Sequence, residues 1–192
     1  MSPLAAEIAP LSFTDLSTRS RCGCKGPGAE QWLRTSGCLV PAGANSAVLD
    51  AEGVLVARLA TSEFLIDALA AAADTPGAAR VRTLRAQLAE RAQPADVYPV
   101  ARLDTVATIC GSSLNQLMRE VCSVDFEPLL GSGQSVVLTS MIGVGVVAWP
   151  HAEPAGPAIT LWCEPSYGHY FWETLREVAQ DIEQRQQGGL SK

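Results

Sequence analysis

The sequence lacks a long apolar run. No stretch reaches the roughly 18 consecutive apolar residues that a membrane-spanning helix needs. The most apolar segment, 135–149, is interrupted by polar residues and glycines and ends at Pro150. Positive charge is also missing from the start of the chain, where no Lys or Arg occurs before Arg19, so the first residues do not form a secretory signal. We therefore expect a cytoplasmic protein with no membrane partner.

Basic residues are in short supply. The chain has 14 Lys and Arg against 20 Asp and Glu, which gives a net charge of -6. No basic stripe can form from so few cations, so we expect no nucleic acid partner. The 192 residues, 47% of them hydrophobic and 18% charged, suit one compact domain with its own apolar core.

Metal-ligating residues are sparse as well. The chain has two histidines, His151 and His169, and its one closely spaced cysteine pair is Cys22 and Cys24. A zinc site takes about four ligands, usually supplied as two spaced pairs. We therefore predict no metal site and interpret the 6 cysteines as buried free thiols in a reducing compartment. A thiol-based metal or redox site at Cys22 and Cys24 remains an alternative, which elemental analysis would reveal.

The glycine-rich segments do not match nucleotide-binding motifs. Lys25 precedes the glycines of the segment 26–28, whereas a P-loop places its lysine after them. The segment 143–148, GVGVVA, fits the pattern G-x-G-x-x-A, with Glu164 about 20 residues further on. That pattern should open a helix, but here the sequence continues as a β-like run, so we interpret the glycines as turn or close-contact positions.

Catalytic groups are not evident either. Ser112 and Ser113 lie at an expected helix start, where serine is a common N-cap, and no G-x-S-x-G motif surrounds them. Asp104 and Asp125 have no histidine or second carboxylate beside them in the sequence. We therefore predict no catalytic and no cofactor-binding residue in this chain.

The sequence does contain an internal repeat. The segment KGPGAEQWLR, 25–34, aligns with CGSSLNQLMR, 110–119, and matches Gly26 with Gly111 and Arg34 with Arg119. Each copy is followed by three β-like runs and a helical pattern. The expected strands are 46–50, 54–59 and 63–67 in the first half, and 134–140, 143–149 and 158–163 in the second.

Each half closes with an amphipathic pattern. We predict helices at 77–91 and 165–186; in the second helix, apolar residues recur at helical spacing from Tyr167 through Phe171 to Ile182. The segment 92–99 reads as a linker and 150–157 as a Pro/Gly loop.

The sequence therefore predicts an α+β protein with a duplicated unit of strand, helix, three strands and helix. The predicted parts are an N-terminal extension 1–18, a first repeat 19–92, a second repeat 98–186 that completes one pseudo-symmetric domain, and a tail 187–192.

The repeat assigns a role to Cys22 and Cys24. They align with Ala107 and Ile109, and residues two apart in a strand point to the same face. Both cysteines thus occupy a face that the second half fills with apolar side chains. We expect them to pack inward.

Aromatic residues gather near the last helix. Six aromatic or histidine residues lie within 162–172, and Trp149 lies in the preceding expected strand. Trp172 is rotated by about 100° from Phe171, away from the apolar stripe. Since such aromatics are enriched at protein interfaces, we predict a subunit interface. Its proposed members are Trp149, His169, Trp172 and Arg176. A large core with one tryptophan at its edge fits the pattern equally well.

Five segments in order carry a family resemblance. They are RCGCKGPGAEQWL, GVLVARLATSEFLID, VCSVDFEPL, VVLTSMIGVGVVAW and LWCEPSYGHYFWETL. Together, over roughly 19–180, they resemble the gamma subunit of heterotetrameric sarcosine oxidases and the equivalent small subunit of N-methylglutamate dehydrogenase. The resemblance implies a fold like the folate-binding domain of the glycine-cleavage aminomethyltransferase, in agreement with the repeat.

The resemblance also implies partners. In such complexes the alpha subunit carries NAD and the tetrahydrofolate site, the beta subunit carries FAD and FMN, and the delta subunit carries zinc. The gamma subunit holds none of these and completes the assembly. The complex oxidises the N-methyl group of a secondary amino acid at flavin, and tetrahydrofolate captures the one-carbon unit. Neither the particular amino acid nor the electron acceptor follows from this chain.

A rival hypothesis is a free-standing folate-binding protein of the same fold. It requires a carboxylate for the pterin ring, for which Asp104, Asp125 and Glu164 are the candidates.

Overall fold

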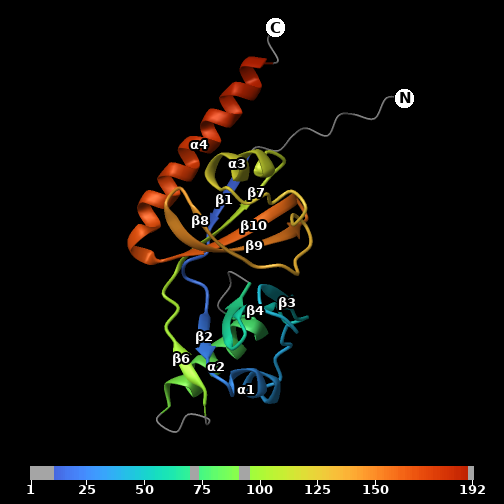
Figure 1. Ribbon diagram of the computed structural model, residues 1–192, viewed down its shortest axis with the longest axis vertical. Coiled ribbons are helices and arrows are strands. Elements are labelled where there is room, and N and C mark those ends of the chain that lie inside the picture. The colour runs from blue at the N-terminus through green and yellow to red at the C-terminus, as the bar shows by residue number, and fades with distance from the viewer. Residues whose placement is uncertain (1–10, 70–73, 91–95, 190–192) are drawn as a thin grey trace, which may run out of the picture.

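The computed structural model describes residues 11–69, 74–90 and 96–189. These residues form two five-stranded antiparallel sheets, each covered on one side by helices (Figure 1). The first sheet and its helices consist of β2 Arg21–Lys25, α1 Ala29–Thr35, β3 Ser46–Leu49, β4 Val54–Ala60, β5 Glu63–Ala68, α2 Pro76–Ala89 and β6 Tyr98–Val100. The second consists of β1 Ser12–Asp15, β7 Thr105–Cys110, α3 Leu114–Val121, β8 Val137–Met141, β9 Val144–Glu153, β10 Gly156–Cys163, a 3₁₀ turn Pro165–Tyr167 and α4 Gly168–Gly189.

The two sheets have the same strand order. The first runs β3-β4-β5-β2-β6 and the second runs β8-β9-β10-β7-β1. In the repeat, β3, β4 and β5 correspond to β8, β9 and β10, and β2 corresponds to β7. The two strand orders are therefore identical. The predicted duplicated α+β unit is therefore confirmed.

The boundaries of the halves differ from the expected ones. β1 lies in the predicted N-terminal extension, yet it pairs with β7, placing Phe13 opposite Ile109. β6 lies in the predicted second repeat, yet it pairs with β2, placing Val100 opposite Gly23. Each half therefore sends its leading strand to the sheet of the other half. The sequence did not reveal this exchange because these strands are only 4 and 3 residues long, too short for a periodic pattern.

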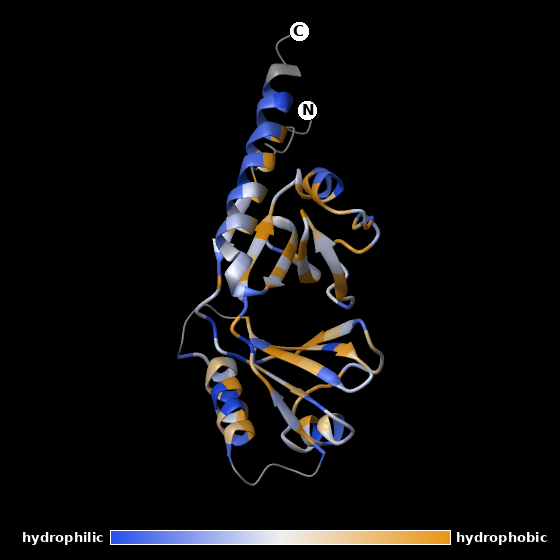
Figure 2. Ribbon diagram, turned by 60° about the vertical axis from the view of Figure 1, so that its left-hand side comes forward, coloured by the Kyte–Doolittle hydropathy of each residue, from blue (hydrophilic) through white to orange (hydrophobic). Residues whose placement is uncertain are grey.

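Three apolar clusters hold the layers together. One lies between the first sheet and helices α1 and α2, a second between the second sheet and helices α3 and α4, and a third between the two sheets. Figure 2 shows the apolar strands of the two sheets facing each other across the middle of the molecule. The protein is thus built of four layers: helices, sheet, sheet and helices.

The closing helices have clear local causes. In α2, Pro76 occupies the first turn and the Thr75 hydroxyl accepts a hydrogen bond from the Ala78 amide at 3.2 Å, which caps the helix. The helix buries Val81, Leu84 and Leu88 against the first sheet. It occupies most of the predicted range 77–91, of which residue 91 lies outside the described part, as do 92–95 of the predicted linker.

The predicted loop 150–157 is mostly strand. β9 continues to Glu153 and β10 begins at Gly156, with Ala158 opposite His151. Pro150 is compatible with a strand here because β8 pairs with β9 only as far as Ala148, so Pro150 lies where β9 has β10 as its strand neighbour. Proline is accepted at such edge positions since the missing N–H breaks no ladder hydrogen bond.

The two glycines matched by the repeat have matching conformations. Gly26 and Gly111 follow β2 and β7 with φ values of 118° and 146°, a region that favours glycine. A Cβ atom on Gly26 would lie 2.3 Å from the Asp96 carbonyl oxygen. Cys22 and Cys24 are buried beneath the helices, as predicted.

Candidate functional site

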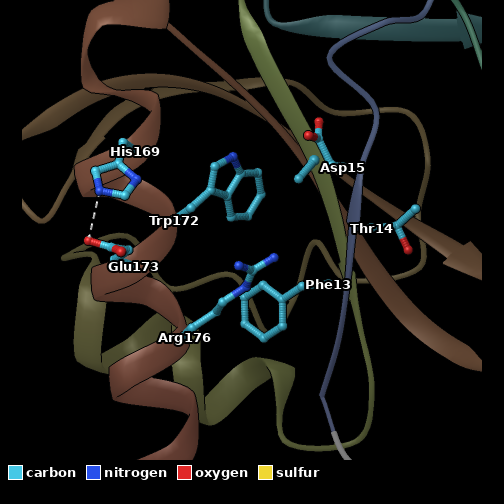
Figure 3. Close-up of a pocket in the computed structure, with 8 residues that line it drawn as sticks. Phe13, Thr14, Asp15, His169, Trp172, Glu173 and Arg176 are labelled. Carbon is cyan, nitrogen blue, oxygen red and sulfur yellow. Dashed lines mark ion pairs between the residues drawn. The ribbon is translucent and has the colours of Figure 1, made fainter.

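Three of the four predicted interface residues line one groove between β1 and α4. His169, Trp172 and Arg176 lie on the side of α4 that faces β1, where Phe13 and Asp15 complete the groove (Figure 3). Its volume is about 270 Å³. We call this feature the β1–α4 groove.

The groove exists because an edge strand lies beside a long helix. Residues 169, 172, 173 and 176 fall on one side of α4, since residues three and four apart are neighbours on a helix surface. β1 supplies the opposite wall. The sequence predicted the helical wall and missed the strand wall, because β1 belongs to a segment that was expected to lie outside the fold.

An aromatic contact forms the floor of the groove. The Phe13 ring meets the Trp172 indole edge-to-face, with centroids 6.3 Å apart and an interplanar angle of 85°, a preferred aromatic geometry. The Arg176 guanidinium carbon lies 6.0 Å from the Phe13 ring centroid, within the range of a cation–π contact. In Figure 3 the Phe13 and Trp172 side chains point toward each other across the space between strand and helix.

Charged groups surround this floor. The hydroxyl and amide of Ser17 hold the pKa of Asp15 below its usual value, with a smaller contribution from Arg176; the Ser17 amide donates to Asp15 Oδ1 at 2.8 Å. On the helix, His169 Nε2 lies 3.2 Å from a Glu173 carboxylate oxygen, and both side chains are exposed. The groove therefore offers acidic and basic groups around an apolar centre.

One donor in the groove is unused. Within the described part of the chain, the buried Trp172 Nε1 has no hydrogen-bond partner. Leaving a buried donor unpaired costs about 1–3 kcal/mol. The Trp172 indole is therefore an unsatisfied polar group within the groove.

Trp149 does not belong to this groove. It is 3% exposed and lies in the core between the sheets, where it stacks on His151 at a centroid distance of 4.0 Å. Its Nε1 donates to the Gly133 carbonyl at 2.8 Å. The prediction that Trp149 lies on a docking surface is therefore wrong for this chain. The cause is the first sheet, which packs on the strand face that carries Trp149 and which the sequence left undefined.

Tyr167 also departs from its expected place. The helical spacing put it on the core stripe, yet it is 53% exposed. It belongs to the 3₁₀ turn Pro165–Tyr167, which has fewer residues per turn than an α-helix and so changes the phase of the pattern. Tyr170 is exposed nearby, and its hydroxyl donates to the Ile142 carbonyl at 3.1 Å.

The cysteines have the properties of buried thiols. All 6 are free, and Cys122 is the one that is partly exposed. Burial raises the pKa of Cys22 and Cys24 to about 12 and that of Cys163 to about 11, so little reactive thiolate forms near neutral pH. Across residues 11–69, 74–90 and 96–189, no group of three or more His, Cys, Asp or Glu side chains is placed to share a metal ion.

Two of the three carboxylates considered for a pterin ring come together. Asp104 and Glu164 line a cavity of about 490 Å³ with Arg102 and Trp162. Asp104 Oδ2 is buried and has no hydrogen-bond partner among the described residues. Asp125 is not part of this cavity; its carboxylate accepts a hydrogen bond from the Glu127 amide at 3.2 Å.

Among the helices described, none is long and apolar enough to cross a membrane.

Comparisons with known proteins identify the fold. No protein-family model matches the sequence, and no curated protein matches it. The structure is similar to a chain of the heterotetrameric sarcosine oxidase from Corynebacterium sp. U-96, whose structure is in complex with pyrrole 2-carboxylate. The TM-score is 0.70 at 20% identity, over 92% of this chain and 89% of that chain.

A second similar structure is the glycine cleavage system aminomethyltransferase T from Bartonella henselae. The TM-score is 0.60 at 14% identity, over 88% of this chain but 46% of that chain. The predicted similarity to the folate-binding fold of this enzyme is thus confirmed. At these identities the comparisons establish the fold, and this chain corresponds to about half of the aminomethyltransferase.

Proposed function

We propose that this chain is the gamma-type, non-catalytic subunit of a heterotetrameric flavoenzyme that oxidatively demethylates an N-methyl amino acid, either sarcosine or N-methylglutamate. The observation that carries the proposal is the reciprocal coverage with the sarcosine oxidase chain, 92% of this chain against 89% of that one. The match therefore spans most of both chains. The aminomethyltransferase match instead joins this chain to part of a larger one.

In this proposal the chain supports assembly and leaves the chemistry to its partners. The partners are an alpha subunit with NAD and tetrahydrofolate, a beta subunit with FAD and FMN, and a delta subunit with zinc, in a cytoplasmic complex. The β1–α4 groove is the proposed contact surface, through His169, Trp172 and Arg176. Its support is the unpaired Trp172 indole and the edge-to-face contact of that indole with Phe13, because aromatic side chains are enriched at interfaces.

Co-expression with the alpha, beta and delta subunits tests the proposal. Light scattering after size exclusion would report assembly, and flavin reduction by sarcosine or by N-methylglutamate would report activity. We expect a complex that is incomplete or short-lived when this chain is omitted. A complex that assembles and turns over equally well without it would refute the assembly role.

A matched pair of variants tests the surface. We expect W172A to weaken assembly, since it removes the centre of the groove. Y98A is the control, because Tyr98 is also exposed but lies on β6, in the other sheet. Equal assembly by both variants would place the contact elsewhere.

A second candidate function is a free-standing folate-binding protein. The observation that favours it is the 490 Å³ cavity in which Asp104 Oδ2 is unpaired and Glu164 lies beside Trp162. Titration calorimetry of the chain alone with tetrahydrofolate distinguishes the two functions. Saturable binding that is lost in D104N would favour the second; absence of heat would favour the first.

A further inference from the structure

A row of polar side chains crosses the inner face of the second sheet. Thr14 on β1 lies opposite Thr108 on β7, Thr108 lies opposite Thr160 on β10, and Thr160 lies opposite Trp149 on β9. Thr108 and Thr160 are buried, at 6% and 1% exposure. His151 follows Trp149 by two residues and stacks on it, so it shares the same face.

The first sheet shows that the fold does not need this row. The corresponding positions there are Ala57 on β4, Leu65 on β5, Gly23 on β2 and Val100 on β6, which lie opposite one another in the same order. None of these four residues carries a polar side chain. The polar row is therefore particular to the second half, and buried hydroxyls that packing does not require call for a different explanation.

The hydroxyls form a connected chain. Thr108 Oγ1 and Thr160 Oγ1 are 2.7 Å apart, and Thr160 Oγ1 is 3.0 Å from His151 Nε2. When His151 Nε2–H donates to Thr160 and Thr160 donates to Thr108, the Thr108 hydroxyl keeps its own proton for another acceptor. In this tautomer of His151 the row ends in an O–H donor at Thr108, whereas the tautomer with Nδ1–H toward the Ala152 carbonyl, 3.5 Å away, reverses the order.

Arg19 brings a positive charge to the same place. Its side chain is 3% exposed, Nη1 donates to the Leu69 carbonyl at 2.9 Å and Nε lies 3.3 Å from Asp67 Oδ1. Nη2 is buried and has no partner among the described residues. Asp67 also faces Arg21, with Nε 3.6 Å from Oδ2, so one buried carboxylate serves two guanidinium groups.

These groups line one cavity. It has a volume of about 190 Å³, and its walls include Arg19, Thr108, Thr160, His151 and, at the exposed rim, Glu153. Burial lowers the pKa of His151, opposed by its contact with the Ala152 carbonyl and by Glu153, while Arg19 lowers it further. A neutral His151 leaves Arg19 as the cation of the cavity.

We propose that this cavity between the sheets binds a small monocarboxylate, with one carboxylate oxygen accepting from Arg19 Nη2 and the other from the Thr108 hydroxyl. Arg19 Nη2 has no partner among the described residues, and an N–H of a cation makes a stronger hydrogen bond to a carboxylate than a neutral donor does. The volume limits the ligand to a few heavy atoms, and the Glu153 carboxylate at the rim disfavours a dianion such as sulfate. This site does not depend on the proposed subunit role.

Acetate titration of the full chain tests the site, at constant ionic strength maintained with sodium chloride. The probe is the pair of imidazole nitrogen resonances of His151, followed by NMR. We expect a saturable shift with acetate and a rise in the pKa of His151, because a bound anion stabilises the imidazolium form. Sulfate at the same ionic strength should produce little shift. Equal, non-saturating shifts with both salts would mean an adventitious ion only and would overturn the proposal.

Variants separate binding from folding. T108V keeps the shape of the side chain and removes the hydroxyl, and we expect acetate affinity to fall roughly tenfold, the effect of losing one hydrogen bond to a charged group. T61V is the control, since Thr61 is exposed at the opposite sheet. R19Q should abolish binding, and because it also removes an ion pair, its chemical-shift spectrum must first show a folded chain. Unchanged affinity in T108V would refute the site even if R19Q fails to fold.

Discussion

The two halves of the molecule share a strand order but differ in what their sheets carry on the inner face. Ala57, Leu65 and Gly23 give the first sheet an apolar row, while Thr160 and Thr108 give the second a polar one. Both rows are buried. The duplication preserved backbone pairing, which depends on main-chain hydrogen bonds, and left the side chains on the shared face free to diverge.

The outer grooves differ in the same way. The counterpart of the β1–α4 groove lies between β6 and α2, with a volume of about 510 Å³. Cys22 lines it at the position where Ala107 lines the β1–α4 groove. Leu103, at its rim, is 78% exposed, whereas the β1–α4 groove presents Asp15 and Arg176. Each half therefore offers a groove of equivalent position and different chemistry.

The largest effect is expected when a side-chain contact between the two halves is removed. Asp67 on β5 accepts a hydrogen bond from the Trp162 indole on β10 at 2.7 Å and faces Arg19 and Arg21. D67A leaves two buried guanidinium groups without their carboxylate, and we expect a loss of about 3–5 kcal/mol in the free energy of unfolding. Urea denaturation measures it. D125A is the control, and an equal, small loss in both variants would contradict the prediction.

The second largest effect is expected when one residue of the polar row is copied into the first sheet. L65T copies the chemistry of Thr160 into the first sheet, where Leu65 is 0% exposed and its row neighbours have no polar side chains. The variant loses apolar burial and buries an extra hydroxyl, so we expect about 2–4 kcal/mol of destabilisation by urea denaturation. A loss below about 1 kcal/mol would show that the two inner faces tolerate the same residues.

A glycine pair tests whether the halves are equally constrained. G26A and G111A both place alanine at positive φ, which costs about 1–3 kcal/mol. In G26A the new Cβ would also lie 2.3 Å from the Asp96 carbonyl oxygen. We expect thermal melts to show G26A as the less stable variant. The reverse order would mean that the turn after β7 is the tighter of the two.

The smallest effect concerns acid stability at the β1–α4 groove. Ser17 holds the pKa of Asp15 below its usual value. A carboxylate of this kind adds stability that is fully present above its unfolded pKa of about 4 and is lost as the pH falls through its folded pKa. The urea midpoint should therefore fall slightly less in D15N than in the wild type when the pH is lowered from about 5 to about 3, on either side of the unfolded pKa. D181N, on the exposed side of α4, is the control; a parallel decline in all three proteins would argue against the prediction.

The sequence was sufficient for the parts of the fold that have a long period or a recurring motif. The strands β3 to β5 lie within a residue or so of their predicted places, and Gly26 and Gly111 marked the repeat. Short or irregular parts were missed for physical reasons. β1 and β6 are too short to show alternation, Pro150 is tolerated because β9 lacks a second strand neighbour there, and a 3₁₀ turn shifted Tyr167 out of phase with α4.

Only one wall of the candidate site could be predicted from the sequence. The helical wall of the groove follows from the position of Trp172 on α4, one residue beyond buried Phe171. The strand wall and the burial of Trp149 depend on which sheet face meets which layer, and this is a tertiary property. The polar row had a faint signal, since Thr108 and Thr160 interrupt runs of apolar residues in two strands, but only the pairing of β7 with β10 joins them.

Because the two halves exchange edge strands, neither sheet can be completed until part of the other half has been synthesised. The first sheet needs β6, so it cannot be completed until the ribosome has passed Val100. β1 is synthesised first but must wait for β7, whose Cys110 lies opposite Ser12. Such long-range closure slows folding and leaves strand edges open in the meantime. A fragment ending in the linker would emerge with one unfinished sheet and one orphan strand, so neither half should be a separable unit in the cell or in a truncation experiment.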